Sequence, residues 1–172
     1  MVGALAVAVI GAVTDVAGRR IPNRLTYPAM LAGIAGHSVY EGWHGLWSAL
    51  AGGLIGGGLF LIFFLLHAMG AGDVKLITAV GCLAGSTHAL QIVLFSAMAG
   101  GVLALVIALW KRRLRSVLGN VLELVRFHAA EGGKVHPTLN LSNPQAIRLP
   151  YGVAIAMGVL SSVLAFYSRG GL

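Results

Sequence analysis

The sequence predicts an all-α polytopic membrane protein with about six transmembrane helices and a cytoplasmic amphipathic helix. Of its 172 residues, 58% are hydrophobic and 25 are glycine, and the mean hydropathy is +0.88. Only 10% are charged, against about 25% in an average soluble domain. A soluble domain of this size needs more polar side chains to cover its surface, and disorder needs low hydrophobicity, so both classes are excluded.

The apolar residues fall into six runs, each a predicted transmembrane helix. A bilayer-spanning helix needs about 20 residues, and six such helices fit outside the polar stretch Lys111–Pro150. We treat residues 1–172 as one membrane-embedded domain with 111–150 as its cytoplasmic loop. No basic residue precedes the first run, so we interpret it as an uncleaved helix and not as a signal peptide. The predicted spans are Val2–Ala17, Leu25–Tyr40, Gly45–Leu66, Leu76–His88, Ala89–Trp110 and Tyr151–Tyr167.

The basic residues predict how these spans are oriented. With the N-terminus outside, 11 of the 12 Lys and Arg residues lie in cytoplasmic segments and only Arg169 lies outside, as the positive-inside rule requires. Topology then explains the net charge of +7, and the basic excess is expected to favour binding to anionic lipid headgroups. No nucleic-acid partner is expected. The 11 residues are Arg19, Arg20, Arg24, Lys75, Lys111, Arg112, Arg113, Arg115, Arg126, Lys134 and Arg148.

The cytoplasmic loop begins with a predicted amphipathic helix over about residues 112–128. Its apolar residues recur at helical spacing and basic residues occupy the other positions, which is typical of a helix lying on a membrane surface. We therefore expect it on the inner leaflet. The apolar residues are Leu114, Val117, Leu118, Val121, Leu122 and Val125.

Small residues in the third and fourth spans predict close helix packing. Glycines recur four residues apart at Gly52/Gly56, Gly53/Gly57 and Gly81/Gly85, a spacing that lets helices approach each other in lipid. The single cysteine, Cys82, excludes a disulfide framework and is expected to be a small packing residue.

Two of the five acidic residues are predicted to lie at membrane depth on the same side. Asp15 lies near the cytoplasmic end of the first span, and Asp73 just precedes the fourth. Ionisable residues at this depth are costly and mark functional sites. Two carboxylates at the edge of a low-dielectric region share a proton, so one accepts a proton from water while the other donates to a carbonyl oxygen. The spacing equally allows simple ion pairs, Asp15 with Arg19 and Asp73 with Lys75 or a nearby arginine.

Three motifs carry a resemblance to a known family. The stretch Gly70-Ala71-Gly72-Asp73-Val74-Lys75-Leu76 matches the GxGD signature of polytopic aspartic proteases. The segment from Asp15 through Arg19-Arg20-Ile21-Pro22-Asn23-Arg24-Leu25 is similar to the first-aspartate motif of type IV prepilin peptidases, and Leu149-Pro150-Tyr151-Gly152 resembles the motif before their last helix. The resemblance covers roughly residues 10–90 and 148–158.

The resemblance implies a membrane aspartic endopeptidase in a bacterial or archaeal cytoplasmic membrane, with Asp15 and Asp73 as its catalytic residues. It implies prepilin-like substrates, cut at the cytoplasmic face, and no cofactor or metal. Larger family members also methylate the new N-terminus and carry a cysteine-bearing domain, whereas this chain has one cysteine. Methyltransferase activity is therefore not expected. The chain looks like the short peptidases of tight-adherence (Flp) pilus systems, with preflagellin or pseudopilin processing as the alternatives.

The residues around the two aspartates have expected supporting roles. Gly70 and Gly72 leave the backbone beside Asp73 uncovered, so that a substrate strand can lie against it. Pro22 disfavours helix at the preceding residue, and Asn23 is a predicted cap of the second helix.

Three basic residues and one proline complete the predicted site. Arg19, Arg20 and Lys75 are expected to reach lipid phosphates, with substrate docking as the alternative. Pro150 suits the first turn of the last helix. His67 shortly precedes Gly70, so contact with the site is possible.

Two other chemistries compete with the aspartic protease. A small proton- or cation-coupled transporter or channel subunit would use the same two aspartates as a relay, although such sites tend to lie near the membrane midplane. A serine protease would need Ser86 and His88 to pair, but no GxSxG-like sequence surrounds Ser86. The six histidines show no metal-ligand spacing.

Overall fold

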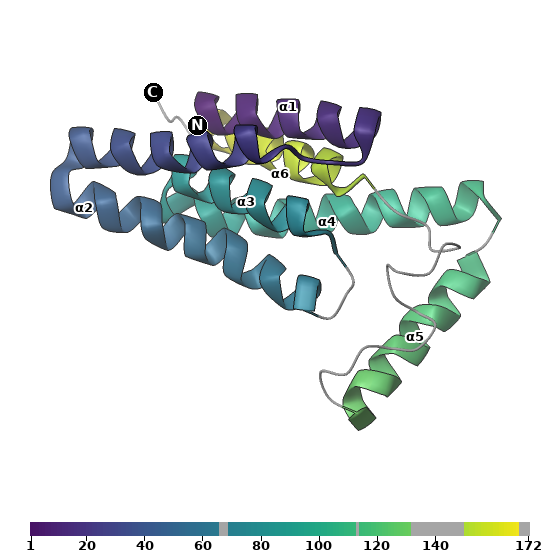
Figure 1. Cartoon of the computed structure of the whole chain (residues 1–172). Coiled ribbons are helices and arrows are strands. Elements are labelled where there is room, and N and C mark those ends of the chain that lie inside the picture. The colour runs from purple at the N-terminus through teal and green to yellow at the C-terminus, as the bar shows by residue number, and fades with distance from the viewer. Residues whose placement is uncertain (66–68, 113, 132–149, 169–172) are drawn as a thin grey trace.

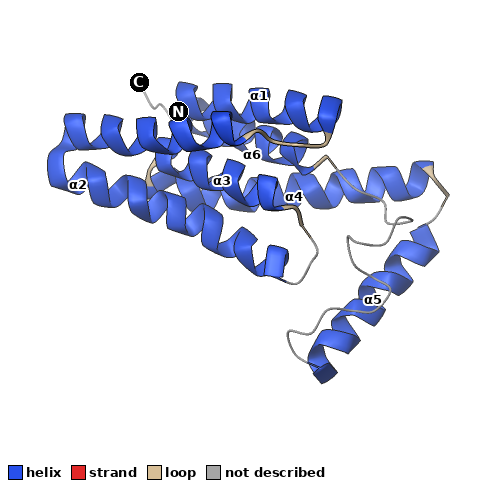
Figure 2. Cartoon of the chain, viewed as in Figure 1, coloured by secondary structure: helices blue, strands red, loops and turns tan. Residues whose placement is uncertain are grey.

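The computed structural model describes residues 1–65, 69–112, 114–131 and 150–168, which form six helical elements and contain no strand (Figure 2). Figure 1 shows α1, α2, α3, α4 and α6 lying lengthwise beside one another, with α5 extending away from them. The all-α prediction is therefore confirmed. The elements are α1 (Val2–Gly18), α2 (Asn23–Leu65), α3 (Ala71–Ala84), α4 (Ser86–Trp110), α5 (Leu114–Glu131) and α6 (Tyr151–Ser168).

Element α2 is a helical hairpin. Its backbone leaves helical geometry at Gly42 (φ 61°, ψ −136°), where the chain reverses direction. A positive φ of this kind suits glycine, which has no Cβ to clash. The two limbs pack so closely that a Cβ on Gly45 would overlap the carbonyl oxygen of His37. The limbs correspond to the predicted spans 25–40 and 45–66, whose last residue lies outside the described part.

The boundary between the next two helices differs from the prediction. We placed it between His88 and Ala89, but α3 ends at Ala84 and α4 begins at Ser86. The break lies at Gly85 (φ 73°), whose N–H donates to the carbonyl oxygen of Gly81 at 2.9 Å. Glycine tolerates this backbone conformation, whereas hydropathy carries no signal for it.

Glycines make the α2–α3 interface, as predicted from their spacing. A Cβ on Gly52 would overlap the carbonyl oxygen of Gly81, and one on Gly56 would lie 2.7 Å from that of Ile77. Cys82 is buried against Gly53, which confirms its expected packing role. The two backbones therefore lie in direct contact, and this contact fixes the position of α3 against the hairpin.

The surface of the bundle is strongly apolar. Within the described residues, α2, α4 and α6 are long and apolar enough to cross a membrane, and the shorter α1 is also apolar. Large hydrophobic side chains face outward along these helices, for example Leu54, Leu94 and Leu164. The fold therefore has the composition and surface of a membrane protein.

The predicted amphipathic helix at 112–128 is present as α5, shifted slightly along the chain. Among the described helices it contacts α4 alone, and Val121, Leu122 and Val125 are exposed on it. The predicted loop that follows α5 lies outside the described residues, as do His67, Arg113, Lys134, Arg148, Leu149 and Arg169.

Candidate active site

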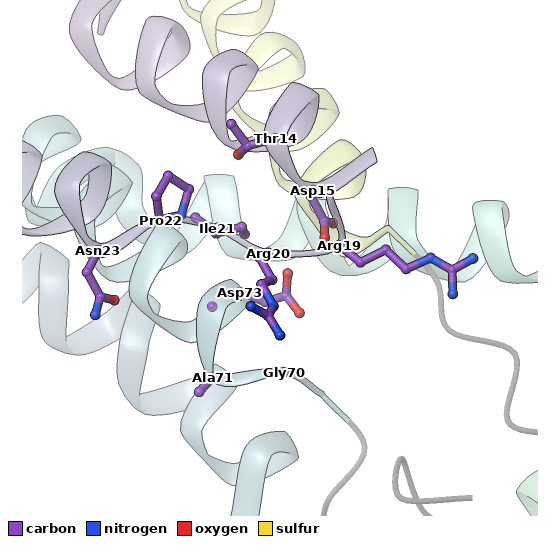
Figure 3. Close-up of a pocket in the computed structure, with 11 residues that line it drawn as sticks. Thr14, Asp15, Arg19, Arg20, Ile21, Pro22, Asn23, Gly70, Ala71 and Asp73 are labelled. Carbon is purple, nitrogen blue, oxygen red and sulfur yellow. The ribbon is translucent and has the colours of Figure 1, made fainter. Parts of the chain in front are cut away.

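The α2 reversal lies at one end of the bundle (Figure 1), and a cavity of about 590 Å³ opens at the other end, where its lining residues are drawn in Figure 3. Three parts of the chain line it: the end of α1, the connection that leads into α2, and the start of α3. Asp15 and Asp73 both line it, although 57 residues separate them in the sequence. The full lining is Thr14, Asp15, Arg19, Arg20, Ile21, Pro22, Asn23, Gly70, Ala71, Gly72 and Asp73.

Asp15 lies in the last turn of α1 and is held by α6. The backbone N–H of Gly152, in the first turn of α6, donates to Oδ2 of Asp15 at 2.9 Å. Gly152 is buried, and a Cβ there would lie 3.0 Å from the Cβ of Asp15. A backbone N–H is a donor only, so it pairs well with a charged carboxylate.

Asp73 lies in the first turn of α3 and is partly buried. Its N–H donates to the carbonyl oxygen of Gly70 at 3.2 Å, which starts the helix. Asp73 precedes the apolar residues of α3 and lies outside the helices long enough to cross a membrane. Burial raises the pKa of its carboxyl group, the charge of Asp15 raises that pKa further, and a backbone hydrogen bond at Gly70 acts in the opposite direction.

The two glycines before Asp73 keep the site open and compact. A Cβ on Gly70 would lie 3.2 Å from Oδ2 of Asp73, and one on Gly72 would lie 3.3 Å from the Cβ of Ile21. Gly72 thus allows the α1–α2 connection to approach the first turn of α3, and Gly70 leaves space beside the carboxylate.

Lys75 does not pair with Asp73. Its Nζ donates to Oδ1 of Asn23 at 3.0 Å, and it lies 5.4 Å from the ring centroid of Tyr27. The amide of Asn23 therefore connects α2 to α3 through its Oδ1, in place of the predicted capping role. Lys75 is thus hydrogen-bonded within the protein, and its expected contact with lipid phosphates stays a prediction.

Arg19 and Arg20 are exposed at the rim of the cavity. Arg19 ends α1 in the left-handed conformation (φ 50°, ψ 32°), and its N–H donates to the carbonyl oxygen of Asp15 at 2.8 Å. Figure 3 shows its side chain extending away from Asp73. Within the described ranges neither aspartate forms an ion pair within 4 Å, so the ion-pair alternative does not describe this site.

The two prolines act at helix starts. The carbonyl oxygen of Pro22 accepts the N–H of Leu25 at 3.0 Å as α2 begins. The carbonyl oxygen of Pro150 accepts the N–H of Val153 at 3.1 Å, so Pro150 stands immediately before α6 as expected.

The competing site residues do not come together. Ser86 Oγ lies 3.3 Å from Ser48 Oγ, whereas the ring of His88 packs edge-on against Phe166 with 5.4 Å between the centroids. In the ranges that the structure covers, no group of three or more His, Cys, Asp or Glu residues is arranged to hold a metal ion.

Sequence reasoning missed three features of the site. Tyr27 supports Lys75, the N–H of Gly152 holds Asp15, and Thr14 lines the cavity. Only Gly152 had a signal, since it follows Pro150 in the recognised motif. A backbone donor has no side chain, however, and so its partner cannot be inferred from residue type.

The fold and the cavity define a helical membrane protein with two carboxylates in one cavity at the end of its bundle. The chain matches the model of the type IV leader peptidase family over residues 2–105, a range that includes both aspartates, and it belongs to this family. The resemblance inferred from the motifs is thereby confirmed. Comparisons with curated proteins and with solved structures gave no match.

Proposed function

We propose that the protein is a membrane aspartic endopeptidase that removes the leader peptide of prepilin-like substrates. The observation that carries this proposal is the convergence of Asp15 and Asp73 on one open cavity, from two different helices. Neither carboxylate is neutralised by an ion pair within the described residues, so both are available for acid–base chemistry.

The environments of the two carboxylates suggest different roles. Asp15, with a backbone N–H at Oδ2, is the charged member and accepts a proton from a water molecule. Asp73, whose pKa is raised by burial and by Asp15, is the neutral member and donates its proton to the scissile carbonyl oxygen. The water oxygen bonds to the carbonyl carbon. Collapse of the tetrahedral intermediate then breaks the C–N bond: the leaving amine takes the proton held by Asp15, and one hydroxyl of the intermediate returns its proton to Asp73 as the C=O bond re-forms.

The proposed membrane topology has about six spans, with the N-terminus outside and the cavity at the cytoplasmic face. Arg19, Arg20 and Arg24 are exposed at the cavity end, where cytoplasmic basic residues are expected. Exposed aromatic side chains flank the α2 reversal at the other end, as is typical of a membrane–water interface. These are Tyr40 (89% exposed), Trp43 (69%) and Trp47 (57%).

Lipid contact is proposed for α5 as well. Lys111, Arg112, Arg115 and Arg126 lie on or just before this helix, together with its exposed apolar residues. A helix with these two properties lies on an anionic membrane surface. We expect it on the inner leaflet, next to the proposed cleavage site.

The decisive experiment is cleavage by the protein reconstituted in lipid vesicles. The substrate is a synthetic prepilin-like peptide with a short basic leader and an apolar helix. Asp15→Asn and Asp73→Asn should each lower the rate by at least about 10³-fold, because each removes one half of the acid–base pair. Glu41→Gln, at an exposed carboxylate in the opposite half of the bundle, is the matched control and should remain active.

Normal cleavage by either aspartate variant would remove that residue from the mechanism. Membership of a peptidase family gives the transporter alternative no support. The transporter alternative would be restored by a different result in the same vesicles. The wild-type protein would cut no peptide but would carry a proton or cation flux, and the aspartate variants would abolish that flux.

A further inference from the structure

The start of α6 lies against the end of α1 at the position of Asp15. Besides the 2.9 Å hydrogen bond from the N–H of Gly152, the two backbones are in close contact. A Cβ at Gly152 would lie 3.1 Å from Oδ2 of Asp15 and 3.2 Å from the Cα of Ala12. A glycine is therefore needed here for its small size as well as for its N–H.

Tyr151, the residue before it, is packed between two other helices. Its ring meets that of Phe60 on α2 edge-on, with 5.6 Å between the centroids. It also fills the space beside Gly100 on α4, where a Cβ would lie 2.7 Å from atoms of the ring. The first turn of α6 is thus fixed to α2 and α4 through Tyr151, while Gly152 faces α1.

We propose that Gly152 is a positioning residue of the active site, whose N–H holds the Asp15 carboxylate in its reactive orientation. The donor occupies Oδ2 and leaves Oδ1 to accept the proton from water. Tyr151 keeps the donor in place, because its ring fixes the helix turn that carries it. This inference rests on the proposed acid–base role of Asp15.

The N–H can be removed without adding atoms by replacing the amide at residue 152 with an ester, using glycolic acid in place of glycine. A hydrogen bond to a charged group contributes enough for its loss to lower kcat about 10- to 100-fold. We expect KM to change less than twofold, because Gly152 is not among the residues that line the cavity. The melting temperature in detergent should match that of the control below.

The matched control is the same amide-to-ester change at Val153, with the corresponding hydroxy acid. The Val153 N–H bonds to the carbonyl oxygen of Pro150 in the same helical turn and does not contact Asp15. This variant should keep kcat within about twofold of the wild type. Equal loss of kcat in the two esters, or no loss in either, would overturn the positioning role.

A second pair of variants tests the need for a glycine with ordinary mutagenesis. Gly152→Ala keeps the N–H but adds a Cβ against Asp15, and should lower kcat about tenfold, since small displacements of a reacting group are costly. Gly101→Ala, where a Cβ meets nothing within 4 Å, should be neutral. If Gly152→Ala and the residue-152 ester were each fully active, the inference would be contradicted. An active Asp15→Asn variant would instead contradict the proposed function itself.

Discussion

Lys75 Nζ and Asn23 Oδ1 lie 3.0 Å apart and join the first turns of α3 and α2. Lys75 lies two residues after Asp73 in the sequence. Asn23 is the first residue of α2 and follows the connection that leaves α1 shortly after Asp15. The hydrogen bond therefore ties together two of the three segments that line the cavity, namely the α1–α2 connection and the start of α3.

This bond predicts coupling between Lys75 and Asn23 in activity. Lys75→Met and Asn23→Ala should each lower kcat about 3- to 10-fold, because an exposed hydrogen bond contributes about 0.5–1.5 kcal/mol. The double variant should be no slower than the worse single variant, since both remove one interaction. The measurement is a double-mutant cycle on peptide cleavage.

Arg24→Gln is the control for loss of positive charge in the same region, and it should be nearly neutral because Arg24 is exposed. Effects that multiply in the double variant would argue against the coupling. A loss confined to Lys75→Met, and restored by raising the share of anionic lipid, would return Lys75 to the phosphate-binding role.

The rate of cleavage should follow a bell-shaped pH profile. One carboxyl group must be charged and the other neutral, so the rate falls at both extremes. Because burial and Asp15 raise the pKa of Asp73, its neutral form persists to higher pH than that of an ordinary carboxyl group. The alkaline limb of the bell should therefore lie at a higher pH than for an ordinary carboxyl group, with activity lost as the pH rises through this elevated pKa. Initial rates measured across the pH range locate both limbs. A rate that still increases through pH 9, with the protein folded, is incompatible with proton sharing.

The orientation can be tested with single cysteines in a Cys82→Ala background. Gly42 lies at the reversal of α2 and Gly119 is an exposed position on α5. A membrane-impermeant maleimide added to intact cells should label a cysteine at residue 42 and fail to label one at 119. Permeabilised cells provide the control in which both react. Labelling at 119 alone would invert the topology and place the cavity outside.

The glycines between α2 and α3 predict a sharp contrast in stability. Gly52→Ala inserts a Cβ into the carbonyl group of Gly81, and such overpacking costs about 1–3 kcal/mol. In Gly58→Ala, on the same limb, the added Cβ would meet nothing within 4 Å. This variant should either raise the stability or lower it by only a few tenths of a kcal/mol. Thermal unfolding in detergent measures both. Equal melting temperatures would mean that the limb and α3 separate readily.

Much of this arrangement could be predicted because a membrane chain has so few polar residues. Asp15 and Asp73 stood out for that reason, and the helical repeat of apolar residues revealed α5. Ser86 and Thr87 follow Gly85 and are polar, but the positive φ that ends α3 at this glycine cannot be read from hydropathy, and the break was missed. The roles of Lys75 and Asn23 depend on which helices become neighbours, and a single sequence does not specify this.

The hydrogen bond to Asp15 comes from α6, which follows the other described helices in the sequence, and this affects biosynthesis. A ribosome produces α1 and α3, with both aspartates, well before α6 emerges. A product truncated within α5 would carry the two carboxylates but lack the donor that orients the first. Under the proposed mechanism, full proteolytic activity therefore requires that α6 has been made and has packed against α1, so that a chain still without α6 is restrained while it is being inserted.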